Sequence, residues 1–230
     1  MTDVIILHGA WHQPAHYAEL ADQLRTRGLS VEVPDLYGLS LAGSTAKVEA
    51  MVSSSSRPPV VVGHSFGGVT AGTVRGAASL VFLNSWILDV DESPAKILAA
   101  TPGEPGEGLL ALPDADGRLH LDLDDARTKL FGDVSEPAAT RALELLRPEP
   151  LSIFDATPTH VSWRDTPSVY LRGQRDRTIV TPLPDRFAGR CSHAEVWDTS
   201  HSPYLSRTTA VADLIQRQRA ADDDQAGPEV

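Results

Sequence analysis

The segment 63–67, with the sequence GHSFG, places a serine between two glycines in a G-x-S-x-G pattern. An apolar run at 60–62 precedes it, and the small residues at 69–76 can continue as a closely packed helix. A sharp turn from strand to helix strains the backbone at such a serine, requires small neighbours, and projects the hydroxyl from the end of the strand. A plain Gly/Ser turn is the alternative, but the flanking elements favour Ser65 as a nucleophile.

A serine hydroxyl is a weak nucleophile near neutral pH, so Ser65 needs a base to take its proton. His201 follows the last predicted strand and precedes the last predicted helix, which places its loop at the same sheet edge as Ser65. We therefore predict that His201 is the base. Other histidines lack this placement and are interpreted as surface or packed residues; they include His64, His120, His160 and His193.

A carboxylate must orient the imidazole of the base. Asp176 follows the penultimate predicted strand, and the resulting chain order Ser, Asp, His is the order that the G-x-S-x-G motif predicts. A solvated turn carboxylate balanced by Arg175 and Arg177 is the alternative interpretation. Asp89, which follows an earlier strand, is the rival acid, whereas Asp198 is expected to close the last strand. We predict Asp176 as the orienting acid.

Acyl transfer also requires two backbone N–H groups directed at the developing oxyanion. The residue after the nucleophile, Phe66, supplies one, and the loop after the first strand supplies the other. Gly9 permits an unusual backbone turn in that loop, so Ala10 is the predicted second donor. Its neighbour Trp11 is a candidate for substrate contact.

Three histidines in and after the same loop, His8, His12 and His16, repeat every four residues and raise the alternative of a metal site. His8 ends a strand, however, and Pro14 interrupts any helix that would align the three rings. We therefore expect no metal site and no cofactor. The single cysteine, Cys191, excludes an internal disulfide and is interpreted as a packed residue.

The chain alternates short apolar runs with helical patterns, which predicts an α/β fold with helices on both faces of a mostly parallel sheet. About six parallel strands are expected, and their carboxyl ends would bring Ser65, Asp176 and His201 to one sheet edge. The predicted strands are 4–7, 29–33, 60–62, 80–83, 168–171 and 194–197, and the predicted helices are 14–27, 45–52, 69–76, 183–188 and 208–219.

At 230 residues the chain is long enough for one α/β domain and too short for two ordinary ones. We predict a single domain over residues 1–220. The regular pattern breaks at about 89–160 into a region with many Pro, Gly and Asp residues, interpreted as a lid insertion with helical character at 127–131 and 137–146. The acidic tail, 221–230, has little apolar content and is predicted to be disordered.

The formal net charge of -11 would repel nucleic acid and anionic lipid, so these partners are excluded. No apolar run approaches the roughly 20 residues of a membrane span, and the amino terminus lacks the pattern of a secretory signal. We therefore expect a cytoplasmic protein that acts on a small molecule. The sequence leaves a homodimer open.

Segments 7–11 (LHGAW), 63–68 (GHSFGG) and 200–203 (SHSP), together with Asp176, resemble the α/β-hydrolase superfamily over nearly the whole chain. Within it, the sequence looks like the branch that contains plant methyl-ester esterases and hydroxynitrile lyases. The resemblance implies the α/β-hydrolase fold, a modest lid, and the two oxyanion donors named above.

Two positions differ from the lyases of that branch, which have Thr after the first-loop histidine and Lys directly after the catalytic histidine. This chain has Gly9 and Ser202 there, and both differences favour an esterase. We therefore expect hydrolysis of a small carboxylic ester, thioester, lactone or amide through an acyl-enzyme on Ser65. Use of the same pocket by a lyase, a cyclase or a ligand-binding protein is the alternative, because fold does not fix function. Aromatic residues that could line the pocket or belong to the core are Trp11, Phe66, Trp86, Phe131, Phe154 and Trp163.

Overall fold

A computed structural model describes residues 2–226 of the chain. Its centre is a sheet of six parallel strands in the order β2-β1-β3-β4-β8-β9, which confirms the predicted α/β-hydrolase arrangement. All six carboxyl ends therefore lie along one edge of the sheet. The strands are β1 (Val4–Leu7), β2 (Val31–Glu32), β3 (Val60–His64), β4 (Ser79–Leu83), β8 (Ser168–Gly173) and β9 (His193–Trp197).

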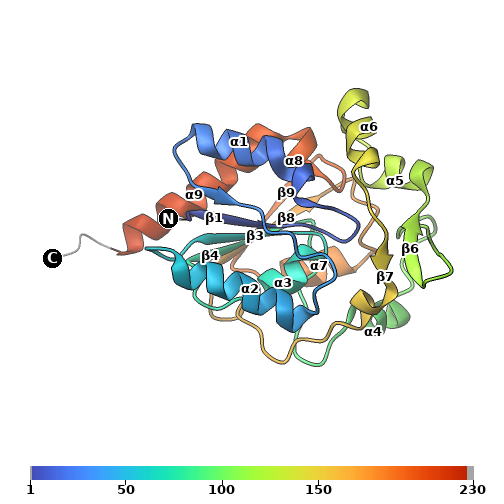
Figure 1. Cartoon of the computed structure of the whole chain (residues 1–230), viewed down its shortest axis with the longest axis horizontal. Helices are drawn as coiled ribbons and strands as arrows, with labels where there is room; N and C mark the ends of the chain where they lie inside the picture. The colour runs from blue at the N-terminus through green and yellow to red at the C-terminus, as the bar shows by residue number, and fades with distance from the viewer. Residues whose placement is uncertain (1, 227–230) are drawn as a thin grey trace.

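Side chains along the central strands alternate between two faces, and each face carries its own helices (Figure 1). In β1, Val4 and Ile6 join the apolar cluster under α1 and α9. Ile5 and Leu7 join the opposite cluster, which includes residues of α2, α3 and α7. The helices around the sheet are η1 (Pro14–Tyr17), α1 (Ala18–Thr26), α2 (Leu41–Ser54), α3 (Gly67–Ala71), α7 (Leu183–Ala188), α8 (Pro203–Ser206) and α9 (Thr208–Ala226).

Some central elements differ in length from the prediction. Strand β2 has only two residues, and the nearby Pro34 cannot donate to a strand ladder. Helix α2 begins earlier than predicted, at Leu41, because the Ser40 side chain accepts the backbone N–H of Gly43 and caps the helix. Helix α3 ends at Ala71, before Gly72, a residue type with low helix propensity.

The carboxyl-terminal helix corrects part of the tail prediction. Residues 221–226, predicted to be disordered, continue α9, because alanines at 220 and 221 favour continuation of a helix that is already packed on the sheet. Residues 227–230 lie outside the described residues. Among residues 2–226, no helix combines the length and apolar character required to cross a bilayer.

The helices and strands in the connection from β4 to β8 lie beyond the carboxyl edge of the central sheet (Figure 1). The predicted helices at 127–131 and 137–146 correspond to α5 and α6, whereas the antiparallel sheet β5-β6-β7 was not predicted. The Asp116-Gly117 dipeptide, with Gly117 at φ +73°, forms the turn between β5 and β6 and is the sequence signal that could have revealed it. The elements are α4 (Pro94–Ala100), β5 (Ala111–Pro113), β6 (Arg118–Leu121), α5 (Leu123–Lys129), α6 (Glu136–Glu144), β7 (Glu149–Pro150) and η2 (Leu151–Asp155).

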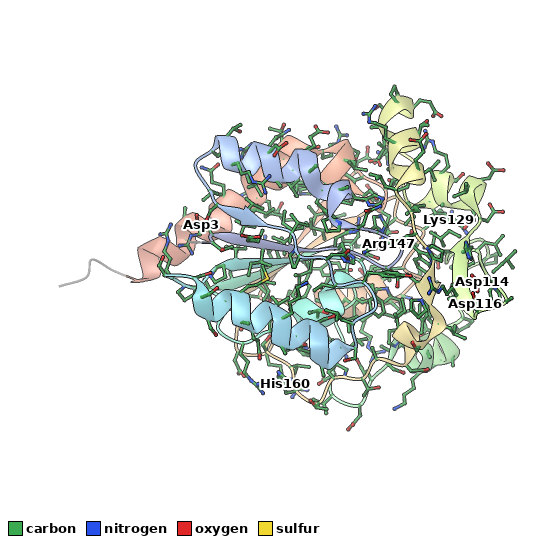
Figure 2. The ribbon with its side chains drawn as sticks, viewed as in Figure 1. Asp3, Asp114, Asp116, Lys129, Arg147 and His160 are labelled. Carbon is green, nitrogen blue, oxygen red and sulfur yellow. The ribbon has the colours of Figure 1, made fainter. Side chains whose placement is uncertain are left out.

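Arg147 connects this insertion by hydrogen bonds to two loops at the carboxyl edge of the central sheet. It lies between the sheet and the insertion, whereas Asp114 and Asp116 lie on the outer side of the insertion (Figure 2). The Arg147 guanidinium donates to both carboxylate oxygens of Asp35, in the loop after β2, at 2.9 and 2.5 Å. Its backbone N–H donates to the carbonyl oxygen of Trp11 at 3.0 Å. The insertion is thus tied to the loops at the carboxyl edge.

Candidate active site

Ser65 lies at the turn between β3 and α3 with a φ of +52°. A serine at positive φ is strained and persists only where its surroundings hold it. The turn packs closely against β1, because a Cβ on Gly67 would lie 2.3 Å from the carbonyl oxygen of Leu7. The segment therefore has the strand–turn–helix geometry of a nucleophile elbow.

His201 and Asp176 form a buried pair at the same edge of the sheet. His201 Nδ1 lies 2.9 Å from Asp176 Oδ2, and the two side chains are 0% and 3% exposed. The other carboxylate oxygen accepts the backbone N–H of Thr178 at 2.8 Å, which fixes the acid. With the proton on Nδ1, the basic nitrogen is Nε2, which is buried and has no hydrogen-bond partner within residues 2–226.

The rival acid Asp89, and Asp198 in the loop before His201, both bind arginines instead. Asp89 accepts two hydrogen bonds from the Arg164 guanidinium, at 2.6 and 2.5 Å. Asp198 pairs with Arg175 at 2.7 Å. Asp176 is thus the carboxylate that the structure brings to the His201 ring.

The predicted oxyanion donors meet beside the serine. Ala10 and Phe66 both line the cavity that Ser65 lines, and neither backbone N–H donates to an acceptor within residues 2–226. The loop after β1 approaches the nucleophile closely, since a Cβ on Gly9 would lie 2.9 Å from Ser65 Cβ. Two unengaged N–H groups beside a serine are what an oxyanion requires.

Several contacts hold the loop after β1 in place. Trp11 has a φ of +61°, its backbone N–H donates to Glu149 Oε1 at 3.0 Å, and its indole N–H donates to the Leu119 carbonyl oxygen at 2.9 Å. His12 Nδ1 lies 2.7 Å from the carbonyl oxygen of Ala10, which fits an N–H donor. The conformation of this loop thus depends on the insertion.

The Ser65 cavity has a volume of ≈ 390 Å³ and a mainly apolar wall. Four of the six aromatic candidates line it: Trp11, Phe66, Trp86 and Phe154. The other two belong to packed regions. Phe131 lies in the apolar core of the insertion, and Trp163 packs against the central core with its indole N–H on the carbonyl oxygen of Leu88.

Asn84, at the end of β4, is a positioning residue that the sequence analysis missed. Its side-chain oxygen accepts the N–H of Gly173 at 2.5 Å, and its amide nitrogen lies 2.9 and 3.1 Å from the carbonyl oxygens of Ser200 and His201. It therefore joins the strand that precedes Asp176 to the loop that carries the histidine. A polar amide directly after a buried strand was the available signal.

His64, predicted to be a surface or packed residue, is fully buried and links two parts of the site. The Gly9 N–H donates to the Tyr17 hydroxyl at 3.1 Å, and that hydroxyl lies 2.7 Å from His64 Nδ1. His64 Nε2 lies 3.0 Å from the carbonyl oxygen of His201. Burial lowers the pKa of His64 well below its usual value, so the ring is neutral, accepting at Nδ1 and donating at Nε2.

The three histidines that are spaced four residues apart, His8, His12 and His16, form hydrogen bonds with backbone groups. His8 Nε2 accepts the N–H of Leu36 at 3.0 Å, and His16 Nε2 lies 3.0 Å from the carbonyl oxygen of Ala142. Within residues 2–226 no group of three or more His, Cys, Asp or Glu side chains is arranged to hold a metal. Cys191 packs against the central core.

Comparison with known proteins agrees with this geometry. Residues 4–214 match the model of the Alpha/beta hydrolase family. A pyrethroid hydrolase of Sphingobium wenxiniae is 25% identical over 248 residues, which cover 94% of this chain and 86% of that protein. An alpha/beta hydrolase of Aspergillus novofumigatus, nvfD, is 25% identical over 244 residues, which cover 93% of this chain and 94% of that protein.

Solved structures show the same fold. The crystal structure of a pyrethroid hydrolase from Sphingobium faniae has a TM-score of 0.79 at 22% identity, covering 97% of this chain and 99% of that one. An Arabidopsis methylesterase has a TM-score of 0.72 at 16% identity, covering 94% and 98%. The expected resemblance to the α/β-hydrolase superfamily is confirmed. With a family model matched from the first strand into the last helix, this chain belongs to the alpha/beta hydrolase family.

Proposed function

We propose that this protein is a serine hydrolase that cleaves small carboxylic esters through an acyl-enzyme on Ser65. The observation that carries the proposal is the buried 2.9 Å hydrogen bond between His201 and Asp176, at the sheet edge where Ser65 occupies a strained turn. The match to a pyrethroid hydrolase over 94% of the chain supports the same reaction type.

In the first half-reaction, Ser65 Oγ attacks the ester carbonyl carbon while its proton moves to His201 Nε2. The carbonyl oxygen gains a negative charge, which the N–H groups of Ala10 and Phe66 stabilise. The C–O bond to the alcohol then breaks, and the leaving oxygen takes the proton from His201. Asp176 stays ionised throughout and stabilises the imidazolium.

In the second half-reaction, water attacks the acyl carbon of the Ser65 ester and gives its proton to His201. Collapse of the second tetrahedral intermediate returns that proton to Ser65 Oγ and releases the carboxylic acid. The neutral Tyr17–His64 pair does not exchange protons in this scheme, but it holds the main chain on both sides of the reacting centre.

The Ser65 cavity favours an ester with a bulky apolar group. Its walls are aromatic and aliphatic, and its volume of ≈ 390 Å³ suits a drug-sized organic moiety. Thioesters and lactones present the same carbonyl chemistry and belong to the same proposal. The insertion at 89–160 serves as a lid in this reading, because Ala95, Leu98 and Phe154 from it line the cavity.

Lyase activity is disfavoured by the residue that follows the base. Release of cyanide from a cyanohydrin develops negative charge on the leaving group, which a nearby cation would stabilise. Ser202 is buried at this position and carries no charge. We therefore expect hydrolysis of an aryl acetate and no comparable release of cyanide from mandelonitrile. Cyanide release without ester turnover would refute the assignment.

The test of the proposed function is covalent labelling of Ser65. A fluorophosphonate should add once to the wild-type protein, as seen by intact mass, and Ser65→Ala should show no adduct and no hydrolysis of aryl acetates. An unlabelled wild type, or equal labelling of both proteins, would remove Ser65 from the mechanism. A cytoplasmic location and the absence of nucleic-acid partners stay predictions from the sequence.

A further inference from the structure

A second cavity adjoins the one that Ser65 lines. It has a volume of ≈ 420 Å³, and Ala10 and Phe66 lie in the walls of both cavities. A substrate whose carbonyl oxygen lies at these two N–H groups therefore has space in two directions. The mechanism above uses only the first cavity.

The two cavities differ in chemistry. The Ser65 cavity is walled by aromatic and aliphatic side chains, whereas the second cavity carries hydroxyl and carboxyl groups among its apolar ones. The polar residues in its wall include Ser40, Ser44, Thr70, Glu149, Ser152 and Asp155. An ester that fills both cavities would be apolar on one side of the scissile bond and polar on the other.

Glu149 is the buried carboxyl group in this wall, and one of its two oxygens has unused bonding capacity. Its side chain belongs to a residue only 4% exposed, and Oε1 accepts the N–H of Trp11. Oε2 has no hydrogen-bond partner in the part of the chain that the structure describes, because the neighbouring Arg147 binds Asp35 instead. Oε2 is not fully shielded from solvent, so a ligand hydroxyl in the cavity can reach it and donate a hydrogen bond to it.

We propose that the second cavity is an arm of the substrate cleft that binds a hydroxyl group of the ester, with Glu149 Oε2 as the acceptor. The inference rests on the proposed hydrolysis at Ser65. The substrate class is an ester with a bulky apolar group on one side of the scissile bond and a short hydroxylated chain on the other. Glu149 fixes specificity and takes no part in bond breaking.

A neutral hydroxyl fits this position better than a cation. Desolvation raises the pKa of Glu149 to about 7, while Arg147 and Asp35 act on it in opposite directions. The positive charge of Arg147 would oppose an ammonium group, whereas a hydroxyl needs no compensating charge. The hydroxyl donates to Oε2 while Oε1 keeps the Trp11 N–H, so the loop after β1 is unchanged on binding.

The test compares matched esters that differ by a single replacement of methyl by hydroxyl. One pair is butyl and 3-hydroxypropyl phenylacetate, and a second pair, naphthyl butanoate and naphthyl 3-hydroxypropanoate, covers the reverse orientation of the substrate. For the wild type we expect kcat/KM to be about tenfold higher for the hydroxylated member of at least one pair. The Kd values of the two esters of each pair are also compared by calorimetry in Ser65→Ala, which separates binding from turnover.

Glu149→Gln retains an oxygen for the Trp11 N–H and removes the charge. The ratio of kcat/KM for the hydroxylated ester to kcat/KM for the alkyl ester should therefore fall severalfold, while the alkyl ester is still cleaved. Ser152→Phe keeps Glu149 but fills the exposed rim of the cavity, and it should lower the ratio as well. Glu144→Gln, an exposed residue of α6, is the matched control and should leave the ratio unchanged.

The inference is overturned if neither pair shows a hydroxyl preference in the wild type, or if the preference survives both Glu149→Gln and Ser152→Phe. In either case, fluorophosphonate labelling and cleavage of the alkyl ester would show that hydrolysis at Ser65 itself holds. If labelling and turnover fail instead, the Kd ratio in Ser65→Ala still decides whether the hydroxyl arm exists.

Discussion

Asp176→Asn isolates the contribution of the buried acid. The contact joins side chains that are 0% and 3% exposed, so solvent does not replace the lost charge. A hydrogen bond to a charged group contributes roughly 1.5–3 kcal/mol. The new amide can also donate to His201 Nδ1, which moves the ring proton to Nε2 and blocks the lone pair that Ser65 requires. Together we expect kcat to fall about 10³- to 10⁴-fold, or roughly 4–5.5 kcal/mol.

The assay is steady-state hydrolysis of an aryl acetate, with thermal unfolding to show that the variant folds. Asp89→Asn is the matched control, because it removes only the pair with Arg164 and should cost less than about threefold in kcat. Refutation would be a folded Asp176→Asn protein with more than a tenth of wild-type turnover. A large loss in Asp89→Asn would move the acid to the earlier strand.

Three further predictions concern the surroundings of the site. Tyr17→Phe removes the hydroxyl between the Gly9 N–H and His64, so kcat should fall about tenfold with little change in KM; equal kcat values would contradict the positioning role. Gly67→Ala places a methyl group 2.3 Å from a backbone oxygen and should lower the free energy of unfolding by about 1–3 kcal/mol, measured by urea denaturation; an unchanged midpoint would show that the turn can relax. Burial raises the pKa of Cys191 to about 12, so iodoacetamide at pH 8 should label the folded protein far more slowly than the denatured one. Equal labelling rates, measured by mass spectrometry, would contradict this effect of burial.

The four inner strands of the central sheet, β1, β3, β4 and β8, could be predicted because they are buried on both faces. Runs such as 4–7 and 60–62 are wholly apolar, and a parallel sheet covered by helices requires this composition. The edge strand β2 and the strands of the insertion are short and partly exposed, so their sequences lack that signal. The tail prediction rested on composition alone and missed the continuation of α9.

Some residues of the site could likewise be predicted from the sequence, and others could not. Ser65, Asp176 and His201 could be placed because each follows a recognisable strand, and the structure brings the acid onto the histidine ring. Asn84 and His64 act through contacts with carbonyl oxygens more than 100 residues away in the chain. Such contacts form only when the sheet has assembled, so no local sequence pattern predicts them.

The attachment of the insertion to the loop after β1 limits how this enzyme can be redesigned. Glu149, Leu119 and Arg147 all bind Trp11, the residue next to Ala10. A chimera that imports the insertion of a relative would exchange the supports of an oxyanion donor together with the pocket wall. Substrate range and turnover rate should therefore change together in such chimeras, and selection for a new ester would act on both properties at once.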